Sequence, residues 1–568
     1  MVIDDELKAR IERLTLDFVR IYTRTGTRRE RDAEAFYRDW FSSVGYFRGG
    51  RLSGFYEIPG DHLGRSIPWC LLKGDGDATV VLLHHYDVVD TDDYMALCGI
   101  ATEPEELMRA FRDGRAALDE ESESDLASGR WIFGRGAADM KGGAAIQMAL
   151  VERYAKMAET APLRGNILLI GLPDEENISA GGRAAPRLLK KLKDEYGLRY
   201  ELALNAEPTE RIPGIGKPAI FTGSIGKIMP LIYVRGKLSH AGTVYDGLNP
   251  IKIISKIVEK LDVIPDLIDS AEGVVSPAPT FLYQKDVKRI YDVSLPLAAS
   301  AYMNVMFLQR SVGEIMDVIR EKCVFAFKEA IGDVQRSFDA FAEVVGREPA
   351  KLPWEAVVKL YSELYAEAVR DSGQQFERAL EETVRDIKAK TASGETDMVS
   401  ASHAVIELTL RYVRDTSPAV IVALTPPYYP VVGNPMLGAA ADRVNRVCDE
   451  VIAFAKDKYD EEYTKSYIVG MSDLSYFMRS GAEDGDAYVR DNMLPLGSVY
   501  ELPFDEIREI SMPVLNIGPL GKDFHEYTER VSKEDLLDRT PDLTAFTIEK
   551  ILGGFAAGVL PPLTGVIK

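Results

Sequence analysis

Residues 78–89 read ATVVLLHHYDVV, and this stretch decides the fold class. Its first half is a short apolar run, the pattern of a strand buried on both faces. Two further apolar runs, Asn166 to Leu172 and Tyr200 to Leu204, follow after helical stretches such as Gly142 to Met157. Strands that alternate with helices build a parallel sheet, so roughly the first 215 residues are predicted to be α/β.

The pattern changes at Ser224, which predicts that a second domain begins there. Asn249 and Pro250 then cap and open a helix that continues through Leu261. The Pro-rich run 425–430 predicts a linker, after which the α/β character returns. We therefore expect an α/β domain in two parts, 1–220 and 428–568, interrupted by a second domain at 221–427 that carries a helical segment at about 311–390.

The composition excludes several classes of partner. The 568 residues hold 68 Lys plus Arg against 89 Asp plus Glu, a net charge of -21 that repels nucleic acid and anionic membranes. The four cysteines show no C-x-x-C spacing, which favours a reducing compartment. Because we also find neither a signal peptide nor a membrane span, we expect a cytoplasmic protein without nucleic-acid or membrane partners.

The strand at 78–89 ends in an H-x-D pair, His85 and Asp87. Residues two apart on a strand share a face, so Asp87 could accept the spare ring N–H of His85 and orient it toward a metal. The alternative is a histidine satisfied by hydrogen bonds in the core, and we assign that role to the neighbouring His84.

Acidic residues follow the other predicted strands. Asp139 lies in a Gly-rich turn, where its carboxylate would repel a pyrophosphate but could bridge two cations; a helix N-cap is the alternative. Glu175 and Glu176 follow the strand that ends at Leu172, and their mutual repulsion is costly unless cations compensate it. One of them could bind metal while the other transfers protons. The alternative without a function is an acidic turn exposed to solvent.

Glu207 and His525 complete the set, because each also follows a predicted strand. Side chains at several strand ends converge on one crevice in an open α/β sheet. Carboxylates with imidazoles and no thiolates suit a hydrolytic pair of zinc ions, for which manganese or cobalt could substitute. The chain contains no G-x-x-x-x-G-K-[ST], H-E-x-x-H or G-x-S-x-G motif, which disfavours P-loop and serine-hydrolase chemistry.

The order H-x-D, G-R-G-x-x-D-M-K-G-G, D-E-E, E-P and a late histidine resembles the di-zinc superfamily of aminoacylases, glutamate carboxypeptidases and succinyl-diaminopimelate desuccinylases. The length and the Pro-Pro-Tyr-Tyr-Pro segment resemble its arginine-utilisation (RocB-like) branch. The resemblance implies a zinc-exopeptidase-like catalytic domain with a central mixed, mostly parallel sheet. It also implies that residues 221–427 form an α+β lid or dimerisation domain, enlarged by the helical insertion.

The resemblance assigns a role to each candidate residue. It implies that Asp139 bridges two metal ions and precedes a cis peptide bond, that Glu175 is the general base, and that His240 stabilises the oxyanion. It aligns Arg310 with an arginine that receives a substrate carboxylate. The implied metal ligands are His85, Asp139, Glu176, Glu207 and His525, and the implied catalytic residues are Glu175, Asp87 and His240.

The implied function is metal-dependent hydrolysis of amide or peptide bonds in small peptides or acylated amino acids. The resemblance also implies a place in amino-acid catabolism and a homodimeric assembly. Exopeptidases and N-acyl-amino-acid deacylases share this machinery, so both remain open. A catalytically silent binding or regulatory homologue is the competing class. The stretch between 90 and 130 is longer than is usual in the superfamily, which leaves access to the site and substrate shape open.

Overall fold

The computed structural model describes residues 3–288, 290–348, 350–479, 483–495, 497 and 499–555. These residues form two compact units. Unit 1 comprises the described residues of Met1–Ser224, Val432–Ser480 and Pro503–Lys568. Unit 2 comprises those of Ile225–Val431 and Gly481–Leu502.

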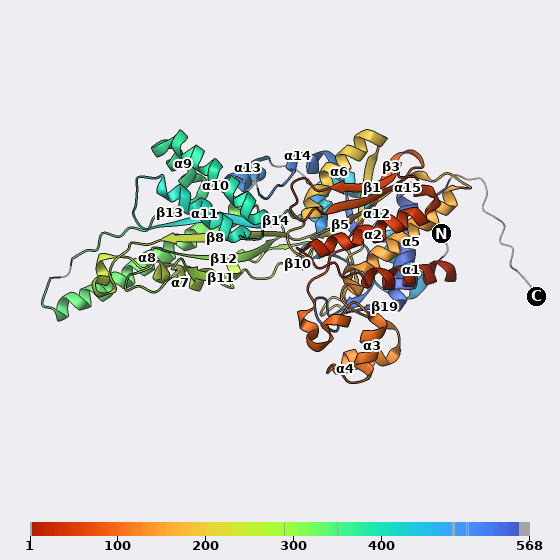
Figure 1. Cartoon of the computed structure of the whole chain (residues 1–568), viewed down its shortest axis with the longest axis horizontal. Helices are drawn as coiled ribbons and strands as arrows, with labels where there is room; N and C mark the ends of the chain where they lie inside the picture. The colour runs from red at the N-terminus through yellow and green to blue at the C-terminus, as the bar shows by residue number, and fades with distance from the viewer. Residues whose placement is uncertain are drawn as a thin grey trace, which may run out of the picture. The chain divides into compact units, whose positions relative to one another are not determined.

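Unit 1 is built on a mixed nine-stranded sheet (Figure 1). Its strands β5, β3, β6 and β17 pair in parallel at the centre, and the outer strands β1, β2, β7 and β15 are antiparallel. The predicted mixed α/β fold is confirmed. The path runs β1 (Ser53–Glu57), β2 (Ser66–Leu72), β5 (Arg164–Leu172), β3 (Asp75–His85), β6 (Arg199–Asn205), β17 (Val514–Asn516), β7 (Ala219–Ser224) and β15 (Val432–Gly433), and β16 (Thr464–Ile468) pairs with β7.

Helices cover both faces of this sheet. The N-terminal helix α1 (Asp5–Val19) buries Leu7, Ile11, Leu14 and Phe18, at helical spacing, in the main core. The side chains of α5, α12 and α15 pack in the same core, while α6 contacts β2 and β5 from the other side. The bounds are α2 (Asp32–Ser43), α5 (Gly142–Ala158), α6 (Ala180–Tyr196), α12 (Asp442–Tyr459), α14 (Phe504–Ile510) and α15 (Thr540–Leu552).

The register of the parallel strands aligns their carboxyl ends. His85 on β3 pairs with Leu172 on β5, and Leu83 pairs with Asn205 on β6. Asn516 on β17 pairs with the same Asn205. The segments that follow these strands therefore leave the sheet at one edge, where the predicted ligands lie.

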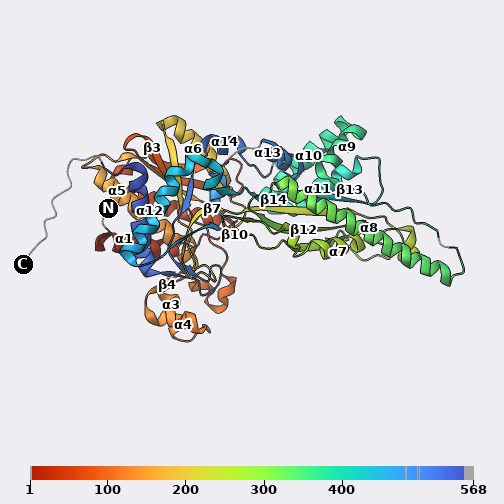
Figure 2. The same ribbon diagram turned by 180° about the vertical axis from the view of Figure 1, so that it is seen from behind.

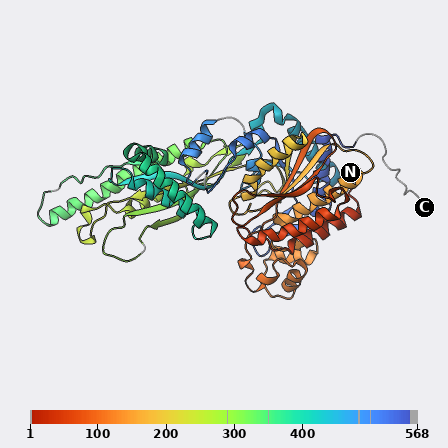
Figure 3. The ribbon, with the colours of Figure 1, turned by 45° about the horizontal axis from the view of Figure 1, so that its top comes forward.

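The enlarged stretch between 90 and 130 forms a small helical lobe of unit 1 with its own apolar core (Figure 3). Tyr94, Leu107, Phe111 and Phe133 are among its buried residues. It contains the 3-10 segment Asp92–Ile100, α3 (Pro104–Arg112) and α4 (Glu120–Ser128), and leads into β4 (Trp131–Phe133), which joins β19 (Arg530–Ser532) and β18 (Gly521–Lys522) in a small sheet.

Unit 2 holds a five-stranded sheet between two layers of helices (Figure 2). Helices α7 and α8 lie along one face, and α9, α10 and α11 lie on the other. Asn249 caps α7 and accepts the N–H of Ile251 at 3.0 Å, as the sequence predicts. The elements are β8 (Gly226–Arg235), α7 (Pro250–Leu261), β9 (Ser270–Ala271), β10 (Val274–Val275), β11 (Thr280–Asp286), β12 (Ala298–Phe307), α8 (Val312–Val344), β13 (Val358–Leu360), α9 (Tyr361–Ser372), α10 (Gln374–Ala392), α11 (Met398–Arg411), β14 (Ala419–Tyr429) and α13 (Glu483–Asn492).

The structure differs from the predicted organisation at two places. The prediction of a linker at 425–430 is wrong, because most of that run belongs to strand β14. Pro426 and Pro427 lie at a register shift between Thr425 and Tyr429, a position where a missing backbone N–H is tolerated. In addition, the residues described within Gly481–Leu502 group with unit 2, although we expected them in the second part of the α/β domain.

Candidate metal centre

Two groups of side chains in unit 1 could each hold a metal ion, and they share Asp139. One group is His85, Asp139 and Glu207; the other is Asp139, Glu176 and His525. Within each group the nearest ligand atoms lie within 4.8 Å of one another. The five residues predicted as ligands are thus brought together, and Asp139 is common to both groups.

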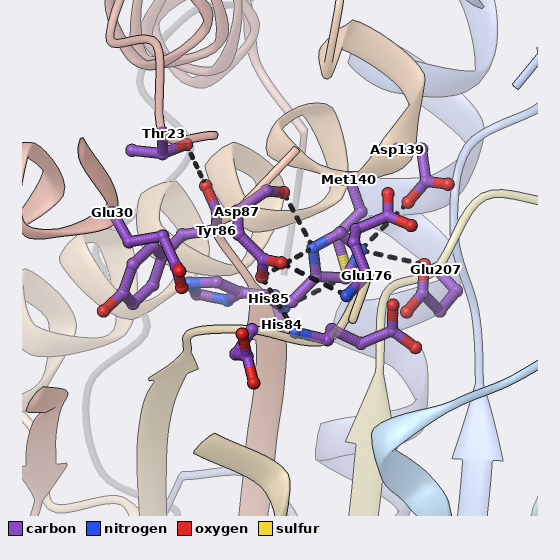
Figure 4. Close-up of polar contacts among 12 residues, drawn as sticks. Thr23, Glu30, His84, His85, Tyr86, Asp87, Asp139, Met140, Glu176 and Glu207 are labelled. Carbon is purple, nitrogen blue, oxygen red and sulfur yellow. Dashed lines mark hydrogen bonds and ion pairs between the residues drawn. The ribbon is translucent and has the colours of Figure 1, made fainter. Parts of the chain in front are cut away.

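His85 projects from the end of β3 into the first group (Figure 4). Its Nε2 lies 2.9 Å from Asp139 Oδ1 and 3.6 Å from Glu207 Oε2. Its Nδ1 donates to the backbone carbonyl of Asp87 at 3.0 Å, so Nε2 is the nitrogen available as a ligand. The Asp87 carboxylate, expected to accept this proton, is farther away at 3.6 Å.

The Asp87 carboxylate instead holds the acidic turn that follows β5. Its two oxygens accept the backbone N–H groups of Glu175 and Glu176, each at 3.1 Å. The side chain is fully buried, so these bonds are protected from water. Asp87 therefore connects the ring orientation of His85 to the placement of both glutamates. Figure 4 shows His85, Asp87 and Glu176.

His525 and Glu176 meet in the second group. His525 Nε2 lies 3.0 Å from Glu176 Oε1 and 3.4 Å from Asp139 Oδ2. The loop that carries His525 can pass close to Glu207 only because residue 518 is glycine: a Cβ there would lie 1.9 Å from the Glu207 carbonyl oxygen. The peptide bond between Asp139 and Met140 is cis, as the resemblance implies.

His84 is the core histidine that we expected. It is fully buried, and its Nε2 accepts the hydroxyl of Tyr37 at 2.7 Å. Its Nδ1 donates to Gln147 Oε1 at 2.9 Å, because the amide nitrogen of Gln147 already donates to a backbone carbonyl. Burial lowers the pKa of His84 to about 4, which keeps the ring neutral.

The electrostatics show a surplus of negative charge. Burial and the neighbouring Asp139 raise the pKa of Glu176 to about 7, and burial also raises the pKa of Glu175 and Glu207. The hydrogen bonds to Asp139 and Glu176 raise the pKa of His525 to about 10. Divalent cations bound at these groups would compensate the negative charge of the carboxylates.

A cavity of about 430 Å³ adjoins the two groups. Glu175, only 5% exposed, lines it together with four of the candidate ligands, Asp139, Glu176, Glu207 and His525. Most of the other lining residues are apolar, the polar ones being Glu210, Ser466 and Tyr467, and no lysine or arginine stands among the described residues that line the cavity. The apolar members are Pro208, Ile212, Pro213, Phe221, Ile468, Val469, Met471 and Phe524.

Two buried ion pairs that sequence reasoning missed support the centre. Glu529 Oε1 accepts the backbone N–H of Asp139 at 3.2 Å, and its Oε2 accepts Arg135 Nη1 at 2.8 Å. Arg135 also donates to the carbonyl of His525 at 3.2 Å and to Asp93 of the helical lobe at 2.8 Å. The only local signal was the arginine of the G-R-G motif.

The second pair lies behind the acidic turn. Arg65 Nη1 lies 2.6 Å from Asp174 Oδ1 and 2.8 Å from Glu30 Oε1, and its Nη2 lies 2.8 Å from Asp61 Oδ1. Asp174 has a φ of 71°, the left-handed region that costs energy for a non-glycine residue, and it directly precedes Glu175. No sequence motif marked Arg65 or Glu30.

The two remaining predicted residues belong to unit 2. His240 is exposed and precedes the 3-10 segment Ala241–Asp246. Arg310 is half-buried and follows β12, where its backbone N–H donates to Asp269 Oδ2 at 3.0 Å. They therefore lie outside the unit that contains the metal ligands.

The fold and the paired ligand groups define the class of metallopeptidases and related amidohydrolases. Residues 82–540 match the model of peptidase family M20/M25/M40, and the chain belongs to this family. It is a metallohydrolase. No helix in the described part of the chain has the length and apolar character needed to cross a membrane.

Individual relatives sharpen this assignment. The chain is 32% identical to protein YqjN of Bacillus subtilis over 493 residues, which is 86% of this chain and 87% of YqjN. It is 30% identical to protein RocB of the same organism over 536 residues, 92% of each chain. The fold is similar to that of the di-peptidase Dug1p from Saccharomyces cerevisiae, with a TM-score of 0.52, 12% identity and coverage of 97% of each chain.

Proposed function

We propose that this protein hydrolyses amide or peptide bonds in small amino-acid-derived substrates, with two zinc ions at the paired ligand groups. The observation that carries the proposal is the shared Asp139 between two groups of three ligands, beside a cavity lined by the buried Glu175. The similarity to RocB supports a substrate from amino-acid catabolism.

Two divalent ions fit the residues present. Each group offers one imidazole and two carboxylates, a donor set that zinc accepts in hydrolytic sites and that manganese or cobalt can share. The pKa values of Glu176 and His525 are raised because carboxylates are close together at these groups, and bound cations would balance that negative charge. When bound, the ions polarise the scissile carbonyl and lower the pKa of water.

Glu175 is the proposed general base and acid. It is within the cavity, close to the ligands but outside both groups of three, so it is free to exchange protons. It takes a proton from the attacking water as the oxygen–carbon bond forms, and it returns that proton to the nitrogen as the carbon–nitrogen bond breaks. Burial raises its pKa toward the range in which both transfers are efficient.

His240 is proposed to stabilise the tetrahedral oxyanion. Its Nδ1 accepts the backbone N–H of Gly242 at 3.0 Å. In the neutral ring the proton must then be on Nε2, which can donate to a developing negative charge. We further propose that Arg310 receives the substrate carboxylate, since Asp269 fixes the backbone N–H groups of Leu308, Gln309 and Arg310 at 2.8, 2.7 and 3.0 Å.

The proposed setting is the cytoplasm, with a small peptide or acylated amino acid as substrate and a homodimer as the assembly. The net charge of -21 supports the exclusion of nucleic-acid and anionic membrane partners. Light scattering coupled to size-exclusion chromatography tests the dimer. A panel of dipeptides and N-acetylated amino acids decides between exopeptidase and deacylase.

Metal analysis combined with Glu175→Gln tests the chemistry. We expect two zinc ions per parent chain and per Glu175→Gln chain, with kcat of the variant lower by about 10²- to 10⁴-fold or more. Glu210→Gln, at another glutamate that lines the cavity, is the matched control and should remain active. A Glu175→Gln variant at the parent rate refutes the base; a parent chain with fewer than about one ion and no gain on adding zinc or cobalt favours the silent homologue.

A further inference from the structure

The 3-10 segment that follows His240 is largely exposed to solvent. The segment Ala241–Asp246 buries none of its residues, and five of the six are exposed. Tyr245 is the exception, since it is half-buried. A loop with so little packing of its own needs an external contact if it is to hold one conformation.

Tyr245 finds that contact on the second half of α8. Its ring centroid lies 5.2 Å from that of Phe338 and 5.3 Å from that of Phe341. Its hydroxyl lies 3.0 Å from Ser337 Oγ and donates to the Ser337 carbonyl at 3.2 Å. These residues occupy the last turns of α8, within the helical insertion.

The base of the loop is held independently of α8. The N–H of Ala241 donates to the carbonyl of Val293 at 2.8 Å, and the N–H of Leu295 donates to the carbonyl of Ser239 at 2.9 Å. This pairing fixes the backbone on either side of His240. Beyond the far end of the loop, Leu248 pairs with Lys237 through two backbone hydrogen bonds of 2.9 and 3.0 Å. Between these two paired ends, Tyr245 is the side chain that attaches the loop to α8.

The part of α8 near Tyr245 is itself anchored to α7. Lys252 forms an ion pair with Asp333 at 2.6 Å, and Lys260 forms one with Glu329 at 3.0 Å. Because α7 begins directly after the loop, both the loop and its support belong to one packed layer of unit 2. The second half of α8 can therefore act as a rigid support.

We propose that Tyr245 is a positioning residue and that the second half of α8 is the platform that fixes the His240 loop. This gives the helical insertion a function in the reaction. The proposal rests on the role of His240 proposed above. Nε2 of His240 must be placed accurately to stabilise an oxyanion, since a displacement of about 1 Å can cost about 100-fold in rate.

Hydrogen exchange of the full-length protein tests the platform without any substrate. We expect Tyr245→Ala to increase amide exchange at residues 239–247, and Tyr245→Phe, which keeps the ring, to have a much smaller effect. Phe325→Ala is the matched control, because Phe325 is an exposed aromatic residue in the first half of the same helix. Unchanged exchange in Tyr245→Ala overturns the proposal.

A double-mutant cycle tests the effect on catalysis, with the fastest substrate of the dipeptide and N-acetyl panel. We expect Tyr245→Ala to lower kcat about 10- to 100-fold with KM nearly unchanged, and to have no further effect in a His240→Ala background. A loss that multiplies in that background overturns the proposal. If exchange increases as expected but His240→Ala is as active as the parent, the oxyanion role fails, and the positioning role fails with it.

Discussion

Glu529 accepts the backbone N–H of Asp139 at 3.2 Å, across 390 residues of sequence. Through Arg135, the same carboxylate is tied to the backbone carbonyl of His525. One buried ion pair thus contacts Asp139, which both candidate ligand groups share, and His525 of the second group. Asp93 of the helical lobe completes the contacts of Arg135, so the lobe supports the metal centre.

Glu529→Gln should weaken metal binding although no ligand changes. Glutamine retains an oxygen for the N–H of Asp139 but loses the charge that pairs with Arg135. We expect metal affinity to fall about 10- to 100-fold, with activity recovered in excess metal. Competition with a chelator measures the affinity. Glu526→Gln, on the exposed part of the same loop, is the control; equal affinities for both variants would contradict the prediction.

The adjacent histidines should respond differently to the same substitution. His85→Ala should lose at least one ion per chain, because Nε2 of His85 faces the first group. His84→Ala should retain both ions but unfold at a lower temperature, since it removes the partner of Tyr37 and Gln147. Metal content by mass spectrometry and thermal unfolding provide the two readouts. Loss of metal from His84→Ala alone would reverse the assignment.

Arg65→Met should destabilise unit 1 and impair catalysis together. The substitution leaves Glu30, Asp61 and Asp174 buried without their guanidinium partner, at a cost of about 3–5 kcal/mol. Catalysis should suffer because Asp174 begins the turn that carries Glu175. Urea unfolding measures the cost. Lys456→Met removes an exposed pair with Asp460 and should cost under about 1 kcal/mol; similar costs for both would refute the prediction.

Glu30→Gln should reduce the loss of stability toward alkaline pH. Burial, with Asp87 and Asp174 nearby, raises the pKa of Glu30 to about 9 in spite of Arg65. The folded chain therefore holds a proton that the unfolded chain releases near pH 4.3, so this group lowers stability as pH rises from about 4 to about 9. Glutamine mimics the neutral acid and has no such dependence. Urea midpoints of parent and variant should diverge between pH 5 and 9; a constant difference would contradict the prediction.

Local sequence predicted the elements that depend on neighbours along the chain. The apolar run before His85 forms β3, and Asn249 caps α7. The linker predicted from the Pro-rich run was wrong, because whether proline interrupts a strand depends on the pairing across the sheet. Local patterns cannot reveal that pairing.

By itself the sequence determined the residue types of the candidate ligands and their positions just after strands or in a Gly-rich turn. Only the tertiary structure decided that His85 rather than His84 faces Asp139, since the two ring environments come from segments distant in sequence. It also decided that Asp87 holds the acidic turn through its backbone. Such contacts follow from how strands and loops pack. The residues involved can lie hundreds of positions apart, so no local sequence pattern predicts their contact.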